Sequence, residues 1–325
     1  MARLYPVQRN NAIVKEYMRS GAVFARGLMA VLYVCLFITL NLGAGDFFAE
    51  VARRAAGASA DQNAVQTGMT ATMIAIFVAT IPMLLLAIAY FIIYFKSRNE
   101  DRASQPDAGL TMLNILAVIE MICTILATVG GIAASVILTI HEYTTHSTAS
   151  RMSTVSMFLN MGGTVLACVI LMIIAIVYRV YIGSINTTAK TTELKNNGAK
   201  AFGVFSVIRA IGGFFTVLAT AGALILFKRL PEFVTQSNGD ANAMNAAMYV
   251  AEKGLPIIIL LMLIAIVTFI SYILDAKIAL GYNNHIKDVR YGLEQQEYQQ
   301  PYGGQQSPRR DYTDRYIDED NYDNY

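Results

Sequence analysis

The sequence has no tryptophan and is poor in charged residues. Of its 325 residues, 15% are charged and 55% are hydrophobic, whereas a soluble domain carries about 25% charged residues. The few charges are also unevenly spread, because long stretches carry none. These shortages exclude an ordinary soluble domain and indicate a membrane protein. Without tryptophan, aromatic anchoring at the membrane surface is left to the 18 tyrosines and 15 phenylalanines.

Cysteine and clustered basic residues are also scarce. The three cysteines, Cys35, Cys123 and Cys168, all lie inside apolar runs, so we expect buried small side chains and no disulfide framework. The net charge is only +2, and no basic tract is longer than two residues. The sequence therefore gives no support for nucleic-acid binding.

Motifs for catalysis or metal binding are missing as well. "HEYTTH" at 141–146 resembles a zinc-protease motif, but a helix turns His141 and His146 about 140° apart, whereas that motif needs histidines four residues apart. "GAGDFF" at 43–48 lacks the third glycine of a phosphate-binding turn, and no Gly-x-Ser-x-Gly elbow is present. We therefore predict a non-enzymatic protein with no cofactor and no metal site.

Long apolar runs are what the chain does have. A membrane-spanning helix needs about 20 apolar residues, and hydrophobicity on all sides of these runs argues against a soluble amphipathic helix. The fold class predicted is all-α, a polytopic membrane protein. Its six transmembrane helices are placed near residues 24–45, 69–95, 112–140, 155–179, 205–227 and 256–276.

The distribution of lysine and arginine predicts the orientation. With the N-terminus inside, 19 of the 25 basic residues lie on the cytoplasmic side, which is the preferred side for them. We therefore expect a multi-pass protein of the cell membrane with both termini in the cytoplasm. A cleaved signal peptide is the rival interpretation of the first run, but its basic leader would be over 20 residues long and no suitable cleavage site follows.

A weak internal repeat of about 90 residues divides the membrane domain. Ala-Ile dipeptides begin at residues 87, 175 and 265, and Arg26, Glu120 and Arg209 align in the alternate runs. Chance similarity among Ile- and Ala-rich segments is the alternative. We predict a cytoplasmic N-terminal segment (1–21) and a membrane domain (22–280) of three tandem helical hairpins, at about 22–100, 110–185 and 202–280.

Glu120 is a carboxylate within an apolar run, and such residues usually mark function. About 20 residues separate each of Arg26, Glu120 and Arg209 from the first polar residue on the outer side, and that length already fills the hydrocarbon core. We therefore predict an interfacial charge cluster of Arg26, Glu120 and Arg209, in which Glu120 lies next to one or both arginines. An ion-relay role at mid-membrane is the alternative.

The C-terminal segment 281–325 differs sharply in composition from the rest. It holds eight tyrosines, five basic and nine acidic residues. A polar stretch with few helix breakers predicts that the last helix continues to about residue 299. Disorder is expected after about 300, because the composition cannot form a core. The residues predicted to make contacts are Tyr302, Arg309, Arg310, Tyr312, Arg315 and Tyr316.

These features favour one function and leave one alternative. The first hypothesis is a membrane protein, in contact with the lipid bilayer, whose cytoplasmic tail organises or recruits a cytoplasmic protein partner. The alternative is a channel or transporter for a small solute through the six-helix bundle.

Overall fold

The computed structural model describes residues 6–56, 62–99, 106–145, 151–236 and 241–298, and all the regular structure in them is helical. The helices are α1 (Pro6–Met18), α2 (Gly21–Ala56), α3 (Gln62–Arg98), α4 (Asp107–Thr145), α5 (Arg151–Lys190), α6 (Ala199–Gln236), α7 (Ala241–Lys253) and α8 (Leu255–Tyr298).

Six of these helices, α2 to α6 and α8, are long and apolar enough to cross a membrane. Each predicted run lies on one of them. The helices extend well past the runs: α8 has 44 residues and continues to Tyr298, as the scarcity of helix breakers after the last run predicts. Its first 20 residues, at 1.5 Å each, already cover about 30 Å.

Local sequence accounts for several helix boundaries. Pro6 occupies the first position of α1, and Pro256 lies in the first turn of α8, where the missing N–H is not needed. Gly198 has a φ of 75° just before α6 begins, a conformation that favours glycine. Pro82 lies inside α3, which continues through it.

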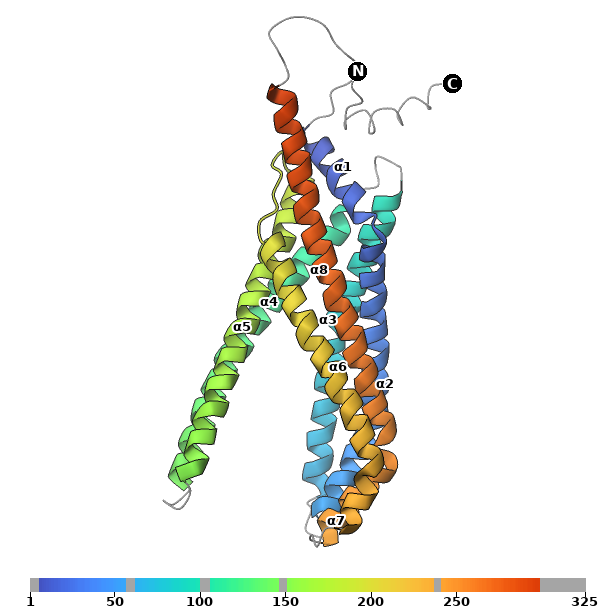
Figure 1. Ribbon diagram of the computed structural model, residues 1–325, viewed down its shortest axis with the longest axis vertical. Coiled ribbons are helices and arrows are strands. Elements are labelled where there is room, and N and C mark those ends of the chain that lie inside the picture. The colour runs from blue at the N-terminus through green and yellow to red at the C-terminus, as the bar shows by residue number, and fades with distance from the viewer. Residues whose placement is uncertain (1–5, 57–61, 100–105, 146–150, 237–240, 299–325) are drawn as a thin grey trace, which may run out of the picture.

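The helices pack mainly in sequential pairs. The most extensive contacts are α2 with α3, α4 with α5, and α6 with α8. The pairs α2–α3 and α6–α8 also pack together through α2 and α8. In Figure 1 the lower part of the α4–α5 pair diverges from the other helices. α7 lies at the lower end of those other helices. The two ends of the molecule are called the α1 end and the α7 end below.

The hydrophobic core lies at the α1 end. Val14, Ile93, Leu110 and Tyr282 are each fully buried there, and they come from α1, α3, α4 and α8. α1 is only 13 residues long but contacts α3 and α5. The α1 end is therefore where the helix pairs are held together.

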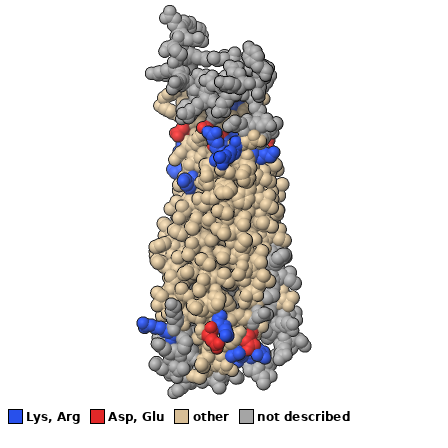
Figure 2. Space-filling view, turned by 90° about the vertical axis from the view of Figure 1, so that its right-hand side faces the viewer, with Lys and Arg blue, Asp and Glu red and all other residues tan. Residues whose placement is uncertain are grey.

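Away from this core, apolar side chains are largely exposed. Leu126 on α4, Leu166 on α5 and Ile225 on α6 are 67%, 61% and 67% exposed. Figure 2 shows Lys, Arg, Asp and Glu gathered near both ends of the molecule, with a broad uncharged band between them on that face. So much exposed apolar surface is unusual for a soluble monomer, whereas it fits a bilayer.

Candidate functional site

A buried ion pair joins α2 to α8. Arg26, in the second turn of α2, places its Nε 2.6 Å from Oδ1 of Asp275. The two side chains are only 12% and 9% exposed. The guanidinium carbon of Arg26 also lies 5.7 Å from the ring centroid of Tyr90. The charges compensate each other at a place where either one alone would be costly.

Two buried tyrosines border this ion pair. Tyr90 on α3 is 6% exposed and Tyr178 on α5 is 8% exposed. Their side chains lie within hydrogen-bonding reach of each other, and the electrostatic fields of Asp275 and Arg26 extend to Tyr178. The tyrosines therefore connect α3 and α5 to the pair formed by α2 and α8.

Glu120 on α4 and Arg209 on α6 lie near the Arg26–Asp275 ion pair, so the remaining two long helices also contribute to this site. The guanidinium carbon of Arg209 lies 4.1 Å from the ring centroid of Tyr272 on α8. Glu120 lies within electrostatic range of Arg209, Asp275 and Arg26, although it forms no ion pair within 4.0 Å with any described residue. We call the group that results the six-helix cluster, with one residue from each long helix: Arg26, Tyr90, Glu120, Tyr178, Arg209 and Asp275.

The structure gives Arg26 a partner that the sequence interpretation missed. Sequence reasoning put Glu120 beside Arg26, Arg209 or both, whereas the ion pair of Arg26 is with Asp275. The available signal was a carboxylate at the end of the last apolar run, two residues before Lys277. Tyr90 and Tyr178 were also missed, because tyrosines near a span end read as ordinary interfacial aromatics.

Charge-free helix extends from the cluster toward the α7 end. Residues 27–45 of α2 and 255–274 of α8 contain no Asp, Glu, Lys or Arg. These stretches measure about 30 Å at 1.5 Å per residue, which is the thickness of a bilayer core. Beyond them, Arg53 and Arg54 pair with Glu50. The six-helix cluster therefore lies at one edge of the charge-free part of the molecule.

The continuation of α8 past the cluster is held by polar contacts. Tyr17 of α1 donates its hydroxyl proton to the Ile278 carbonyl at 2.7 Å, and Tyr282 donates to the Lys195 carbonyl at 3.0 Å. Arg290 donates to the Leu194 carbonyl at 2.9 Å. Burial raises the pKa of Tyr17 to about 12. We call these contacts, which fix α8 to α1 and to the α5–α6 connection, the α8 brace.

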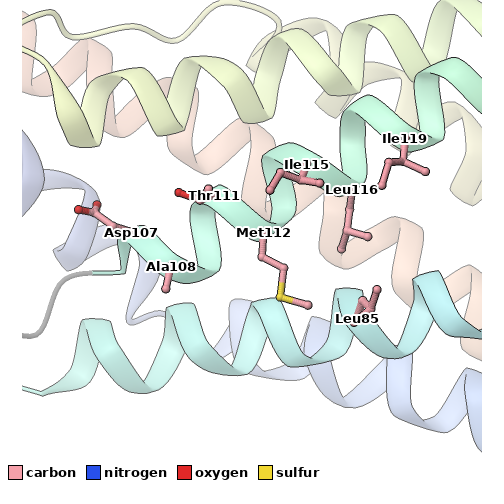
Figure 3. Close-up of a pocket in the computed structure, with 8 residues that line it drawn as sticks. All are labelled: Leu85, Asp107, Ala108, Thr111, Met112, Ile115, Leu116 and Ile119. Atoms are coloured by element: carbon pink, nitrogen blue, oxygen red, sulfur yellow. The ribbon is translucent and has the colours of Figure 1, made fainter.

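A shallow groove lies between α3 and α4, and its last lining residue, Ile119, directly precedes Glu120 of the cluster. Figure 3 shows Leu85 of α3 facing Met112 and Leu116 of α4, with Asp107 at one end and Ile119 at the other. Its volume is about 520 Å³, and its lining is almost wholly apolar.

Other predicted residues lie outside the part of the chain that is described. Tyr302, Arg309, Arg310, Tyr312, Arg315 and Tyr316 all fall in residues 299–325. The side chains of "HEYTTH" at 141–146 are likewise not described. Among the residues that are described, no three or more His, Cys, Asp or Glu side chains lie close enough together to hold a metal ion.

Comparison with protein families, with curated proteins and with solved structures finds no match for this chain. The arguments for its function therefore come from its own residues.

Proposed function

We propose that this protein is a non-enzymatic, six-span protein of the cell membrane whose cytoplasmic tail organises or recruits a protein partner. In this proposal the α1 end faces the cytoplasm, together with both termini, and α7 lies outside. The excess of lysine and arginine assigned to the α1 end supports this direction.

Three tandem helical hairpins are the proposed architecture. The sequential packing of α2 with α3, α4 with α5 and α6 with α8 supports it. The repeated alanines give further support, since Ala87, Ala175 and Ala265 are 1%, 4% and 8% exposed. The low exposure that these three alanines share is consistent with a repeat of about 90 residues.

The observation that carries the recruiting function is the unbroken course of α8. It runs from Leu255 through the charge-free segment to Tyr298, directly before the part of the tail that is predicted to be disordered. The α8 brace fixes the cytoplasmic part of the helix to α1 and to the α5–α6 connection. A tail that starts from a fixed helix is displayed at a defined place. If the segment after about residue 300 is disordered, as its sequence predicts, its tyrosine and arginine side chains gain affinity by acting together.

The test is to remove residues 301–325 and measure partner recovery by crosslinking, together with localisation of the protein. A second variant replaces the five tyrosines of that segment by serine, which keeps its length and charge. We expect both variants to remain in carbonate-washed membranes and to lose the partners that the full chain recovers.

A matched control replaces Arg309, Arg310 and Arg315 by lysine, which keeps the charge but weakens stacking on aromatic rings. We expect an intermediate loss of partner recovery. If the truncated chain recovers the same partners and keeps the same localisation, the recruiting function is wrong.

The second candidate function is a channel or transporter for a small solute. It is favoured by the six-helix cluster, because ionisable groups shared among membrane helices commonly mark an ion or solute pathway. Reconstitution into liposomes, followed by solute or ion flux measurements, separates the two functions. Flux that depends on Glu120 and Asp275 but not on residues 301–325 would support transport.

A further inference from the structure

Three junctions connect the three helix pairs, and one of them is incomplete. α2 packs against α8 and α3 packs against α4, whereas α5 and α6 share the least extensive of the three junctions. In Figure 1 the lower part of the α4–α5 pair diverges from α6 and from the other helices. Each pair thus contacts the other two, and the α5–α6 junction is the one that is left open toward the α7 end.

The α5–α6 junction is tight at the α1 end and open beyond it. Phe202 of α6 is 4% exposed, and its ring centroid lies 4.9 Å from that of Tyr178 on α5. Thr216 and Ala167 lie on the same faces of α6 and α5, fourteen and eleven residues further toward the α7 end. Both of them are exposed. The two helices therefore separate within about 20 Å of their tight contact.

Glu120 belongs to the diverging pair, and Arg209 belongs to α6. Glu120 is exposed and lies within electrostatic range of Arg209, but no ion pair within 4.0 Å joins it to any described residue. Arg209 lies over the ring of Tyr272 instead. An unpaired charge at the edge of the hydrocarbon core is costly, so the two side chains gain by approaching each other.

The α1 end of the α4–α5 pair is held in place. The side-chain amides of Asn10 and Asn11 donate to the carbonyls of Thr191 and Ala189, at the end of α5, at 3.0 and 3.3 Å. Leu110 of α4 is fully buried in the core at the same end. Movement of the pair is therefore confined to its other end, and the α1 end is the hinge.

We propose that the α4–α5 pair swings about this hinge and closes the α5–α6 junction, and that an ion pair between Glu120 and Arg209 stabilises the closed state. Rigid-body movement of packed helices is a common form of switching. The inner face of α6 suits a close contact, because Thr216 and Thr220 bond to carbonyls of their own helix and small residues let membrane helices approach closely.

Closure would cover Glu120, so the two states differ in whether the six-helix cluster is accessible from the bilayer. The proposal uses the membrane placement proposed above. It goes beyond the recruiting function, because it does not involve the tail.

The test measures the α5–α6 distance by electron–electron double resonance, with the full-length protein in lipid nanodiscs and its three native cysteines replaced by alanine. Spin labels are attached at Leu166→Cys on α5 and Ile225→Cys on α6, which are 61% and 67% exposed. We expect two distance populations, of which the longer corresponds to the open arrangement. Labels at Leu42→Cys on α2 and Leu261→Cys on α8 span the packed α2–α8 junction, and this reference pair should give one population.

Glu120→Gln and Arg209→Gln each remove the proposed ion pair. We expect each to lower the ratio of the short to the long population by about two- to fivefold, because a partly exposed ion pair is worth up to about 1 kcal/mol. The matched control is Glu252→Gln, whose carboxylate pairs with Lys253 at the α7 end, and it should leave the ratio unchanged.

A single α5–α6 distance population that neither variant changes would overturn the proposal. Two populations with the same ratio in all the variants would also overturn it, because the ion pair would then not stabilise the closed state. An equal change at the reference pair would show general loosening and would contradict a hinge. Retention of each variant in carbonate-washed membranes is measured in parallel, which distinguishes failure of the switch from failure of the membrane placement.

Discussion

Arg26 and Asp275 are 249 residues apart in the chain, and their side chains meet at 2.6 Å. This contact fits one register of α2 against α8, since a shift of one turn along α2 would bring Ala22 or Ala30, and not Arg26, opposite Asp275. Both side chains are largely buried, so neither can exchange its partner for water. The pair also connects the first long helix to the last.

Removing one member of this pair should be costly. Arg26→Met or Asp275→Asn leaves a buried charge without its partner, and we expect each to lower the free energy of unfolding by about 3–5 kcal/mol. The double variant Arg26→Met/Asp275→Leu should be close to the unmodified protein, because it leaves no charge to compensate. Unfolding in mixed micelles, followed by circular dichroism, measures all three.

The exposed pair at the other end of α2 provides the control. Arg53 bonds Glu50 at 2.8 Å but is 61% exposed, so Arg53→Met should leave stability unchanged within error. The outcome that would contradict charge compensation concerns Arg26→Met/Asp275→Leu. If this double variant loses as much stability as Arg26→Met and Asp275→Asn added together, packing dominates at Arg26.

Glu120 should tolerate neutralisation better than Asp275. It is exposed and forms no ion pair within 4.0 Å with any described residue, so Glu120→Gln should cost about 0–1 kcal/mol. The comparison is made with Asp275→Asn under the same unfolding conditions. Equal losses for the two variants would mean that Glu120 is as tightly coupled to the arginines as Asp275.

Two glycines of the long helices should respond in opposite ways to alanine. A Cβ at Gly109 would come within 2.6 Å of the Ile93 side chain and 2.8 Å of the Ala89 carbonyl, whereas one at Gly212 would meet nothing within 4 Å. We expect Gly109→Ala to cost about 1–3 kcal/mol through forced separation of α3 and α4. Gly212→Ala should gain about 0.5–1 kcal/mol, because glycine is entropically unfavourable within a helix. Equal effects of the two changes on thermal unfolding would contradict the close approach at Gly109.

Alkaline pH should weaken the α8 brace through Tyr17. Its pKa in the folded protein is raised to about 12, against 10.0 for an unburied tyrosine. The stability contributed by its neutral hydroxyl is therefore fully present below pH 10 and is lost as the pH rises toward 12. Tyr17→Phe cannot ionise, so the loss of stability between pH 10 and 12 should be smaller in this variant. Identical pH profiles, measured by thermal unfolding, would show that Tyr17 does not contribute.

Much of the fold could be predicted from the sequence because hydrophobic length is a local property. Six long helices were expected and are present, since runs of about 20 apolar residues leave few other structures open to the backbone. α1 was not predicted, because its helix depends on contacts with α3 and α5 that sequence pattern does not reveal.

The site was less accessible to sequence reasoning. Arg26, Glu120 and Arg209 drew attention because charges interrupt apolar runs. Asp275 did not, because it falls at the edge of a run, and its importance comes from a helix register set by residues 249 positions away. The divergence of the α4–α5 pair from the other helices (Figure 1) likewise has no signature in local sequence.

The central claim is that the α1 end of a six-span protein faces the cytoplasm and the α7 end faces outward. The most direct test uses single cysteines in a background in which Cys35, Cys123 and Cys168 are replaced by alanine. Lys253→Cys lies at the end of α7, and Glu294→Cys lies near the end of α8. With a membrane-impermeant maleimide, the account predicts labelling of Lys253→Cys in intact cells and of Glu294→Cys only after permeabilisation. Labelling of Glu294→Cys in intact cells, with Lys253→Cys protected, would contradict it.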